Sequence, residues 1–398
     1  MKNFDNFKIN YKKVLFRADL NVPVVNSQIT DKSRIKSIKP SIRKLLKQKN
    51  KIFILSHFGR PKGKIDKQYS LKFLCSILQQ EFEINKIYFL ENLDEKNILS
   101  KIDEMNFGEI CLVENIRFFP EEENNDKNFA KKLSKFFDVY VNDAFSSSHR
   151  EHVSIVGLTK FLPSVAGDSL IKEINNINSF LEKPKKPNTA IIGGSKISTK
   201  IHLLNNLVKL FDTIIIGGAM ANTFLYSNNI SIGISLVEKN LSEDAKKIQV
   251  KAKNYNCKLV LPVDAVCSNN TKDKDNIQYC EIKEVLPDKM ILDIGNKTIN
   301  LIKNEILNSK MILWNGPLGA FEFKPFDQGT TEIAHTIKMF AKNLKINSIV
   351  GGGDTISSIK SAKAENGFTY ISNAGGAFLE WLEGKESPGI RALKKNNV

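Results

Sequence analysis

Short apolar runs rich in β-branched and aromatic residues alternate with longer segments in which apolar residues recur every three or four positions. The runs predict strands and the longer segments predict helices. Strands that alternate with helices are typical of βαβ units, which pair their strands in parallel. The expected strands of the first half are 13–17, 51–56, 86–90, 109–114 and 139–142, and its expected helices are 33–49, 70–82 and 126–137. In the second half we expect strands at 189–192, 213–216, 258–263, 311–314, 347–350 and 368–372.

A stretch with two prolines and three lysines, residues 180–187, follows a helical pattern and divides the chain nearly in half. Proline cannot continue a helix or a buried strand, so this stretch is the best candidate for a linker between two α/β domains. Weak alternation over the lysine-rich residues 273–302 predicts an antiparallel excursion from the second domain.

The composition is that of an ordinary globular protein, with 398 residues of which 41% are hydrophobic and 26% charged. Five scattered cysteines without a C-x-x-C pair favour neither a disulfide framework nor a cysteine-based zinc site, which suits a reducing cytoplasm. The start has no apolar stretch of the signal-peptide kind, and no apolar run reaches the ~18 residues of a spanning helix. We therefore expect a cytoplasmic protein that is neither secreted nor embedded in a membrane.

The net charge of +16 comes almost entirely from lysine, because only seven of the 59 basic residues are arginines. Six of these arginines and three of the five histidines lie in the first 152 residues. An arginine fork binds carboxylate or phosphate in a way that a lysine cannot replace. The clustering therefore predicts an anion site in the first half, whereas the lysines are better explained as a compositional bias on solvated faces.

Polar and basic side chains follow four predicted strands of the first half, and the ends of parallel strands meet at one edge of a sheet. Arginines and a histidine there can clamp a dianion, and an aspartate and an asparagine can bind a hydroxyl or carboxylate. For any single residue a surface ion pair is the alternative. The candidates are Asp19, Asn21, Arg34, His57, Arg60, Arg117 and Arg150.

The second half places glycines directly after strands, at 193–194 and 351–353. Glycines let backbone amides surround phosphate oxygens, and lysines neutralise the charge. Neither segment is a P-loop or a dinucleotide fingerprint. Asp354 has the alternative role of capping its helix. The nucleotide-site candidates are Lys196, Lys200, Gly352, Gly353, Asp354 and Thr355, together with Glu322 for a ribose hydroxyl.

An anion site in one half and a nucleotide site with Mg²⁺ in the other indicate phosphoryl transfer, which depends on positioning and charge neutralisation more than on a nucleophile. Two alternatives remain. A nucleic-acid-binding module would explain the charge of +16, but acidic residues lie among the arginines. An NAD-dependent oxidoreductase would explain the glycine turns, but the dinucleotide fingerprint is missing.

The ordered motifs R-x-D-x-N-V-P, S-H-x-G-R-P, E-N-x-R-F, D-A-F…H-R-x-H, G-G-x-K-I-x-x-K, W-N-G-P-x-G-x-F-E and G-G-G-D-T, with a late glycine-rich turn, span nearly the whole chain. In this order they resemble the phosphoglycerate kinase family. The resemblance implies reversible transfer of the acyl phosphate of 1,3-bisphosphoglycerate to ADP-Mg²⁺, giving 3-phosphoglycerate and ATP, without nucleic-acid or membrane partners.

The resemblance also implies a hinged monomer of two Rossmann-like domains, each a mainly parallel sheet flanked by helices, facing each other across a cleft. Residues 1–165 would bind phosphoglycerate, 166–187 would form the hinge helix and linker, 188–375 would bind nucleotide and 376–398 would return to the first domain.

The residue roles carried over from the family divide the candidates between the two substrates. Asp19, Asn21, Arg34, His57, Arg60, Arg117 and Arg150 would hold phosphoglycerate, and Lys196, Lys200, Glu322 and 352–355 the nucleotide. Arg34 and Lys196 would neutralise the phosphoryl group in flight, and Asp354 would hold Mg²⁺. Thr199, Asn296, the serines at 146–148 and Ala374 depart from the family pattern, which puts the geometry of the Lys200 loop and of the last glycine turn in question.

Overall fold

The computed structural model describes residues 1–26, 28–182, 184–344 and 346–396. The chain divides into two compact units, which are described separately. The first unit contains residues 1–175 and 386–398, and the second contains residues 176–385. Within the described ranges, no helix is long and apolar enough to cross a membrane.

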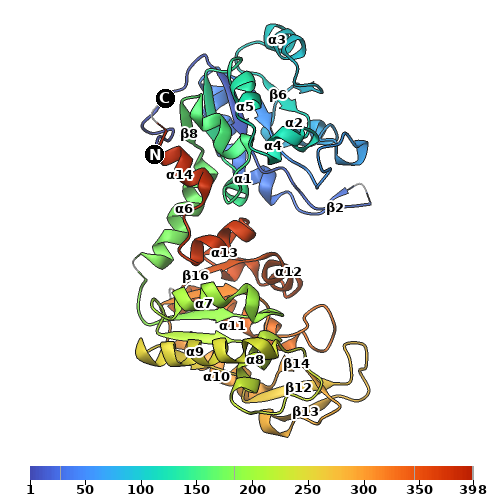
Figure 1. Cartoon of the computed structure of the whole chain (residues 1–398), viewed down its shortest axis with the longest axis vertical. Coiled ribbons are helices and arrows are strands. Elements are labelled where there is room, and N and C mark those ends of the chain that lie inside the picture. The colour runs from blue at the N-terminus through green and yellow to red at the C-terminus, as the bar shows by residue number, and fades with distance from the viewer. Residues whose placement is uncertain (27, 183, 345, 397–398) are drawn as a thin grey trace. The chain divides into compact units, whose positions relative to one another are not determined.

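The first unit is built on a parallel sheet of six strands in the order β5-β6-β4-β1-β7-β8. Figure 1 labels β6 and β8 of this sheet among the helices of the unit. Its strands are β1 (Lys13–Arg17), β4 (Lys51–Leu55), β5 (Ile87–Leu90), β6 (Ile110–Val113), β7 (Val139–Asn142) and β8 (Ser164–Ala166), and a small hairpin joins β2 (Val24–Val25) to β3 (Gln28–Ile29). The five strands predicted for this half are confirmed within one residue at each end. The three-residue strand β8 was not predicted.

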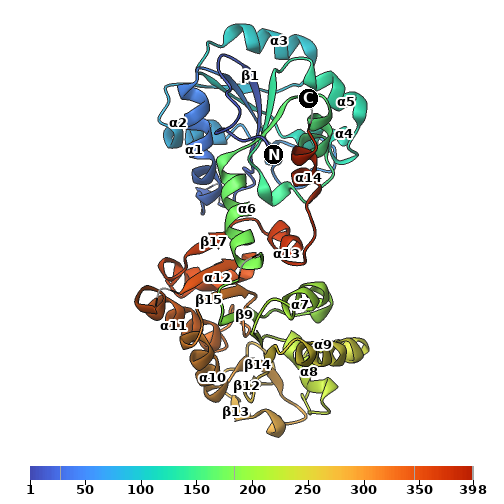
Figure 2. The same ribbon diagram turned by 90° about the vertical axis from the view of Figure 1, so that its left-hand side faces the viewer.

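Helices cover both faces of this sheet, with α1 and α2 on one side and α4 and α5 on the other (Figure 2). The helices are α1 (Ser33–Lys47), α2 (Leu74–Phe82), α3 (Glu95–Glu104), α4 (Pro120–Glu123), α5 (Lys127–Ser134) and α14 (Pro388–Lys394). Single turns form η1 (Lys67–Tyr69), η2 (Ile116–Phe118), η3 (Phe145–Ser147), the π-helical η4 (Val153–Gly157) and η5 (Leu158–Lys160). The three predicted helices exist but are shorter, and α3, α4 and α14 were not predicted.

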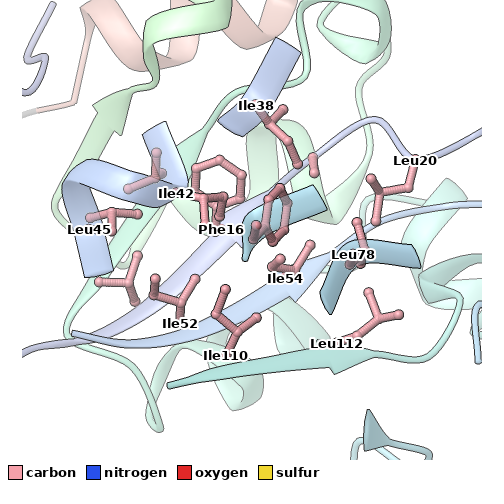
Figure 3. Close-up of a cluster of buried hydrophobic side chains, with 14 of the residues drawn as sticks. Phe16, Leu20, Ile38, Ile42, Leu45, Ile52, Ile54, Leu78, Ile110 and Leu112 are labelled. Atoms are coloured by element: carbon pink, nitrogen blue, oxygen red, sulfur yellow. The ribbon is translucent and has the colours of Figure 1, made fainter. Parts of the chain in front are cut away.

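Alternation along the strands explains how the sheet supports both layers, because successive side chains point to opposite faces. Phe16 packs with Ile54 and with Ile38 and Ile42 of α1 on one face (Figure 3). Its neighbour Leu15 belongs to the core on the other face. Because helices bury both faces of the sheet, polar side chains are left to the loops that follow the strand ends.

The second unit contains another parallel sheet of six strands, in the order β11-β10-β9-β15-β16-β17. Its strands are β9 (Asn188–Ile192), β10 (Thr213–Ile216), β11 (Lys258–Val260), β15 (Met311–Asn315), β16 (Asn347–Gly351) and β17 (Tyr370–Ser372). All six were predicted, although β11 and β17 are shorter than expected.

An antiparallel sheet of three strands, β12 (Asp264–Ser268), β13 (Gln278–Glu281) and β14 (Met290–Ile294), accompanies the parallel sheet. This confirms the predicted antiparallel excursion but corrects its bounds. The excursion begins at Asp264, and residues from Asn296 onward belong to a helix instead of a strand. Asp264 accounts for that change, because its carboxylate accepts the backbone N–H groups of Lys297 and Thr298 at 2.8 Å each and so caps the helix.

The remaining helices of the second unit lie on both sides of its parallel sheet, with α10 and α11 opposite α7, α8 and α9 (Figure 2). They are α7 (Ile201–Leu207), α8 (Met220–Ser227), α9 (Ser242–Asn254), α10 (Asn296–Leu307), α11 (Gln328–Leu344), α12 (Gly353–Ser361) and α13 (Gly376–Leu382), with short turns η6 (Ile197–Thr199), η7 (Lys239–Leu241), η8 (Ile282–Glu284) and η9 (Glu365–Gly367).

The boundary between the units falls inside helix α6 (Asp168–Leu181), between residues 175 and 176. The predicted linker, 180–187, includes Lys183, which lies outside the described residues. At the other end, the second unit extends to residue 385, ten residues beyond the expected boundary, because α13 packs against α7. The chain then returns to the first unit as expected, where Gly389 N–H donates to the carbonyl oxygen of Ser148 at 2.8 Å. Residues 397 and 398 of the expected final segment are not among those described.

Candidate active site

Loops from four neighbouring parallel strands, β6, β4, β1 and β7, carry the anion-site candidates of the first unit except Arg34, which lies in the first turn of α1. All four strands end at the same edge of the sheet, as their sequence positions predicted. The positive charges of Arg17, Arg34, Arg117 and Arg150 all act on the imidazole of His57. The structure therefore brings these arginines together around one histidine.

Arg34 is held in place by the loop that follows β1. Its Nη1 atom lies 2.6 Å from Asp19 Oδ2 and donates to the carbonyl oxygen of Asn21 at 3.0 Å. Asn21 in turn accepts the backbone N–H of Gly59 at 3.0 Å, which links the loops after β1 and β4. Asp19 also accepts a short hydrogen bond from the hydroxyl of Ser146. These contacts fix the guanidinium of Arg34 at the first turn of α1.

Arg117 is almost completely buried, and its Nη1 donates to the carbonyl oxygen of Gly59 at 2.8 Å while its Nε lies 3.2 Å from Glu123 Oε1. Burial, reinforced by the nearby positive charge of Arg150, lowers the pKa of Arg117 to about 10. Arg150 is half-buried and Arg60 is exposed. Within the described residues neither of these two guanidinium groups forms an ion pair, so both can bind an anion.

His57 lies beneath this group of arginines and is 7% exposed. Burial, followed by the charges of Arg17 and Arg117, holds its pKa well below the usual range. The imidazole is therefore neutral near pH 7 and acts as a hydrogen-bond donor or acceptor, not as the additional cation that a histidine among arginines suggests.

Three backbone segments of the second unit cross closely where β9, β10 and β15 end, at Gly193, Gly218 and Gly316. A Cβ atom on Gly193 would lie 2.0 Å from the carbonyl oxygen of Pro317, and one on Gly218 would lie 2.6 Å from that of Gly194. Gly218 also has a φ of +66°. Side chains are excluded from this crossing, which leaves the backbone itself as the floor of a pocket.

The pocket beside this crossing has a volume of about 320 Å³. Apolar side chains such as Leu236, Ile291 and Leu318 line it, and the carboxylates of Glu322 and Asp354 lie at it. An apolar wall with a few polar groups can hold the flat ring of a nucleotide base, and the exposed carboxylates can bind polar groups attached to that base.

Lys200 is buried at the start of α7 and donates a short hydrogen bond to the side-chain oxygen of Asn315. Burial lowers its pKa to about 8, although the carboxylates of Asp354 and Glu383 partly offset this. Lys196, in contrast, is exposed. The turn between the two lysines is fixed by Ser198, whose N–H donates to Glu238 Oε2 at 2.9 Å.

Helix α12 begins at Gly353, and its N-cap is Gly352, with a φ of +100°. Asp354 lies in the first turn, two residues after the N-cap, so the N-cap role considered for it is wrong. The oxygen of Thr355 accepts the N–H of Gly316 at 2.7 Å, which joins this helix to the turn after β15. The Asp354 carboxylate is thus exposed beside the pocket and is not committed to its helix.

A family model of phosphoglycerate kinase matches residues 4–385 of the chain. The chain belongs to the phosphoglycerate kinase family. The phosphoglycerate kinase of Chelativorans sp. (strain BNC1) is 42% identical over 395 residues, covering 99% of both chains, and that of Rhizobium meliloti (strain 1021) is 43% identical over 386 residues, covering 97% of this chain and 96% of the relative. A solved structure of phosphoglycerate kinase from Coxiella burnetii aligns with a TM-score of 0.89 and 36% identity, covering 99% of this chain and 98% of the other.

Membership in the phosphoglycerate kinase family confirms the resemblance and the fold class predicted from the sequence. The protein is a phosphotransferase of glycolysis that catalyses reversible phosphoryl transfer between 1,3-bisphosphoglycerate and 3-phosphoglycerate with ADP and ATP. This decides against both the oxidoreductase and the nucleic-acid-binding module as its primary activity.

The residues that depart from the family pattern lie in well-formed local structure. The Thr199 hydroxyl donates to the carbonyl oxygen of Lys196 at 2.9 Å and so closes the turn η6. Asn296 is the first residue of α10, where proline is common, but the cap from Asp264 does not depend on that residue. Ala374 is buried before Gly375, which supplies the left-handed conformation at the start of α13. Ser146 adds a hydroxyl contact to Asp19.

Two groups of pocket residues of this phosphoglycerate kinase were missed in the sequence. Gly218 lines the pocket and, with Gly217, follows β10 in the same way that the recognised glycines follow their strands, so that signal was present. Residues of β14 also line the pocket, including Asp293, whose pKa burial raises to about 8. No local pattern marks that strand as a pocket wall, because it belongs to a separate sheet.

Among the described residues, no group of three or more His, Cys, Asp or Glu side chains is placed to bind a metal ion by itself. Magnesium in phosphoryl-transfer sites is usually bound through one or two carboxylates and the phosphates of the substrate. The exposed carboxylate of Asp354 beside the pocket fits that donor set.

Proposed function

We propose that the first unit of this phosphoglycerate kinase binds 3-phosphoglycerate or 1,3-bisphosphoglycerate. The observation that carries the proposal is the placement of Arg34, Arg117 and Arg150 close enough to the neutral His57 for their charges to act on it, at the carboxyl edge of the sheet. Several cations suit a phosphate and a carboxylate, and the fixed Asp19 and Asn21 suit a hydroxyl. The proposed ligand residues are Asp19, Asn21, Arg34, His57, Arg60, Arg117 and Arg150.

The second unit is proposed to bind ADP or ATP. Its pocket of about 320 Å³ has apolar walls for a base. Asp354 at the start of α12 lines the pocket, and Lys200, on whose ammonium the Asp354 carboxylate acts, is available for phosphates. We assign the base to the pocket, the ribose to Glu322 and the phosphates to Lys196, Lys200 and the residues from Gly352 to Thr355. Residues 1–165 and 188–375 are thus proposed as the two substrate domains.

Phosphoryl transfer itself is assigned to charge neutralisation by Arg34 and Lys196. Phosphoryl transfer places developing negative charge on the equatorial oxygens of the group in flight, and fixed cations stabilise that charge. Arg34 is held by Asp19 and Asn21, so its charge is in position before the substrate binds. Asp354 would hold Mg²⁺, which supplies charge neutralisation at the nucleotide phosphates when it is bound.

A coupled assay with 3-phosphoglycerate, ATP and Mg²⁺ tests the proposal directly. Binding of each substrate to wild type and to single variants is then measured by calorimetry. Arg150→Ala is expected to weaken the binding of 3-phosphoglycerate and to leave nucleotide binding unchanged. Glu322→Ala is expected to weaken nucleotide binding and to leave 3-phosphoglycerate binding unchanged. A variant that weakens only the other substrate would contradict the assignment.

Replacing Asp354 by asparagine is expected to weaken productive Mg-nucleotide binding and to leave 3-phosphoglycerate binding intact. Asparagine keeps the shape but removes the charge needed for the metal. Titration of ADP with and without Mg²⁺ measures the effect: magnesium should strengthen binding to wild type but not to the variant. The neighbouring variant Ser357→Ala, on the same helix, serves as a control. Equal responses to magnesium in wild type and Asp354→Asn would contradict the role.

The pKa of Lys200 predicts a basic limb in the pH dependence of nucleotide use. Because the pKa is lowered to about 8, Lys200 carries its charge below that pH and loses it as the pH rises, with about a tenth still protonated at pH 9. The kcat/KM for nucleotide should therefore fall above pH about 8. Asp293 titrates in the same range, so Lys200→Arg is needed to assign the limb: an always-charged side chain should abolish it, whereas an unchanged limb would exclude Lys200.

Substrates on separate units also imply that the units must close over both before in-line transfer, which excludes water from the reacting group. We propose that the enzyme works as a hinge-bending monomer in the cytoplasm. X-ray scattering should show a smaller radius of gyration with 3-phosphoglycerate and a non-hydrolysable Mg-nucleotide together than with neither, and less compaction with either one alone. Identical scattering in all four states would contradict closure.

A further inference from the structure

A chain of buried polar side chains lies beneath His57 and uses residues that the proposed function does not. It begins at Arg17, the last residue of β1, which is 1% exposed and therefore enclosed by protein. Arg17 Nη2 lies 3.1 Å from His57 Nδ1, and Arg17 Nε donates to the hydroxyl oxygen of Ser154 at 2.9 Å. Arg17 is thus one of the clustered arginines of the sequence, but its guanidinium is directed to protein groups.

The chain continues from Ser154, in the π-helical turn η4, to the buried carboxylate of Glu122 in α4. The Ser154 hydroxyl donates to Glu122 Oε1 at 2.5 Å, and its backbone N–H donates to Oε2 at 2.8 Å. His152 Nδ1 lies 3.6 Å from the same Oε1. Glu122 is 1% exposed, and its negative charge acts on the buried guanidinium of Arg17 more strongly than that of Asp19.

The chemistry of these groups determines the proton positions on His57. A guanidinium has five donors and no acceptor, so the His57 nitrogen that faces Arg17 must accept. His57 Nδ1 is therefore unprotonated, and in the neutral ring the proton resides on Nε2. The other charged groups that act on His57 are also cations, Arg34 from α1, Arg117 from η2 and Arg150 from the loop after η3, and they favour the neutral ring.

We propose that Glu122 is a positioning residue of the phosphoglycerate site, which acts through Ser154 and Arg17 to hold His57 as the neutral tautomer with its proton on Nε2. In this state His57 offers one oriented N–H donor to an anionic oxygen of the substrate. The proposal rests on the proposed role of His57 in substrate binding. Glu122 itself does not contact substrate, because it is enclosed beneath the arginines.

The tautomer can be measured without substrate, by ¹⁵N shifts and two-bond ¹H–¹⁵N correlations in protein labelled at its five histidines. His57→Gln identifies the signals of His57. Wild type should show an unprotonated Nδ1 and a protonated Nε2. Ser154→Ala, which removes the bridge without changing any charge, and Glu122→Gln should both give averaged or exchanged tautomers. Ser154→Ala alone completes the test if Glu122→Gln does not fold.

Kinetics separate positioning from a general loss of structure. If His57 contributes to substrate binding, both variants should raise the KM for 3-phosphoglycerate by about tenfold to a hundredfold with kcat nearly unchanged. The double variant should have a KM no higher than that of the poorer single variant, because both substitutions interrupt the same series of hydrogen bonds. A structural role would instead lower the active fraction, and hence kcat, without changing KM.

Tyr140→Phe is the matched control. The Tyr140 hydroxyl, equally buried in β7, donates to the backbone carbonyl oxygen of Ser154, and within the described residues it makes no hydrogen bond to the side chains of Arg17, Ser154 or Glu122. This variant should lose thermal stability and keep both the His57 tautomer and KM. The proposal is overturned if folded Ser154→Ala keeps the wild-type tautomer, or if Tyr140→Phe changes it equally. If the tautomer responds as expected but 3-phosphoglycerate leaves the wild-type His57 signals unmoved, the substrate role of His57 fails while its positioning by Glu122 stands.

Discussion

Replacing Arg34 by alanine is expected to lower kcat by about 10³–10⁵-fold, the range that a single arginine supplies in comparable phosphoryl transfers. Asp19 and the carbonyl oxygen of Asn21 both engage Nη1 of Arg34, and within the described residues Nη2 and Nε have no partner. The fork is thus oriented at one end and open to an anion at the other. Rapid-quench kinetics at saturating substrates measure the loss, and the KM values should change far less.

Two further variants make this test specific. Arg34→Lys should recover only part of the activity, because one ammonium replaces a planar fork. Arg43→Ala removes an arginine from the same helix whose guanidinium lies 2.9 Å from Glu83, and its kcat should stay within about twofold of wild type. Near-wild-type kcat in Arg34→Ala would mean that another group neutralises the phosphoryl group in flight.

The convergence of candidate residues in the first unit could be predicted because it depends on topology alone. Once β1, β4, β6 and β7 are recognised as parallel strands, their carboxyl ends must share an edge, and residues such as Asn21 and His57 follow those ends directly. Short but nearly uninterrupted apolar runs, buried on both faces of the sheet, made these strands easy to find. The strand β8 was missed because three residues without a large aliphatic run carry no periodic signal.

What could not be predicted depends on contacts between distant segments. Arg17 appeared in the sequence as one more arginine for an anion, but the side chains that enclose it come from residues 40 and 137 positions away. Glu122 lies in an acidic stretch that is typical of a solvated helix start, and nothing nearby in sequence shows that it is buried. Whether a charged side chain meets ligand or protein is decided by packing, which a motif does not record.

Lys196→Ala is expected to lower kcat by about 10²–10³-fold, the usual cost of removing one preorganised charge from a transition state. The ammonium group is exposed, but its backbone is fixed, since its carbonyl oxygen accepts the Thr199 hydroxyl and the next turn is tied to Glu238. A side chain anchored in this way can reach a phosphoryl group without reorganising its loop. Single-turnover measurements in both directions should show the same loss, because one transition state serves both.

The control for Lys196 is Lys246→Ala, which removes an exposed lysine of α9 that pairs with Glu243 and should leave kcat and both KM values within about twofold. Comparison with Lys200→Ala then separates two roles for neighbouring lysines. Lys200 is buried against Asn315, so its loss should raise the KM for nucleotide, whereas the loss of Lys196 should appear mainly in kcat. If Lys196→Ala instead raised only the nucleotide KM, Lys196 would be a ligand of the bound nucleotide, and Arg34 alone would accompany the phosphoryl group in transfer.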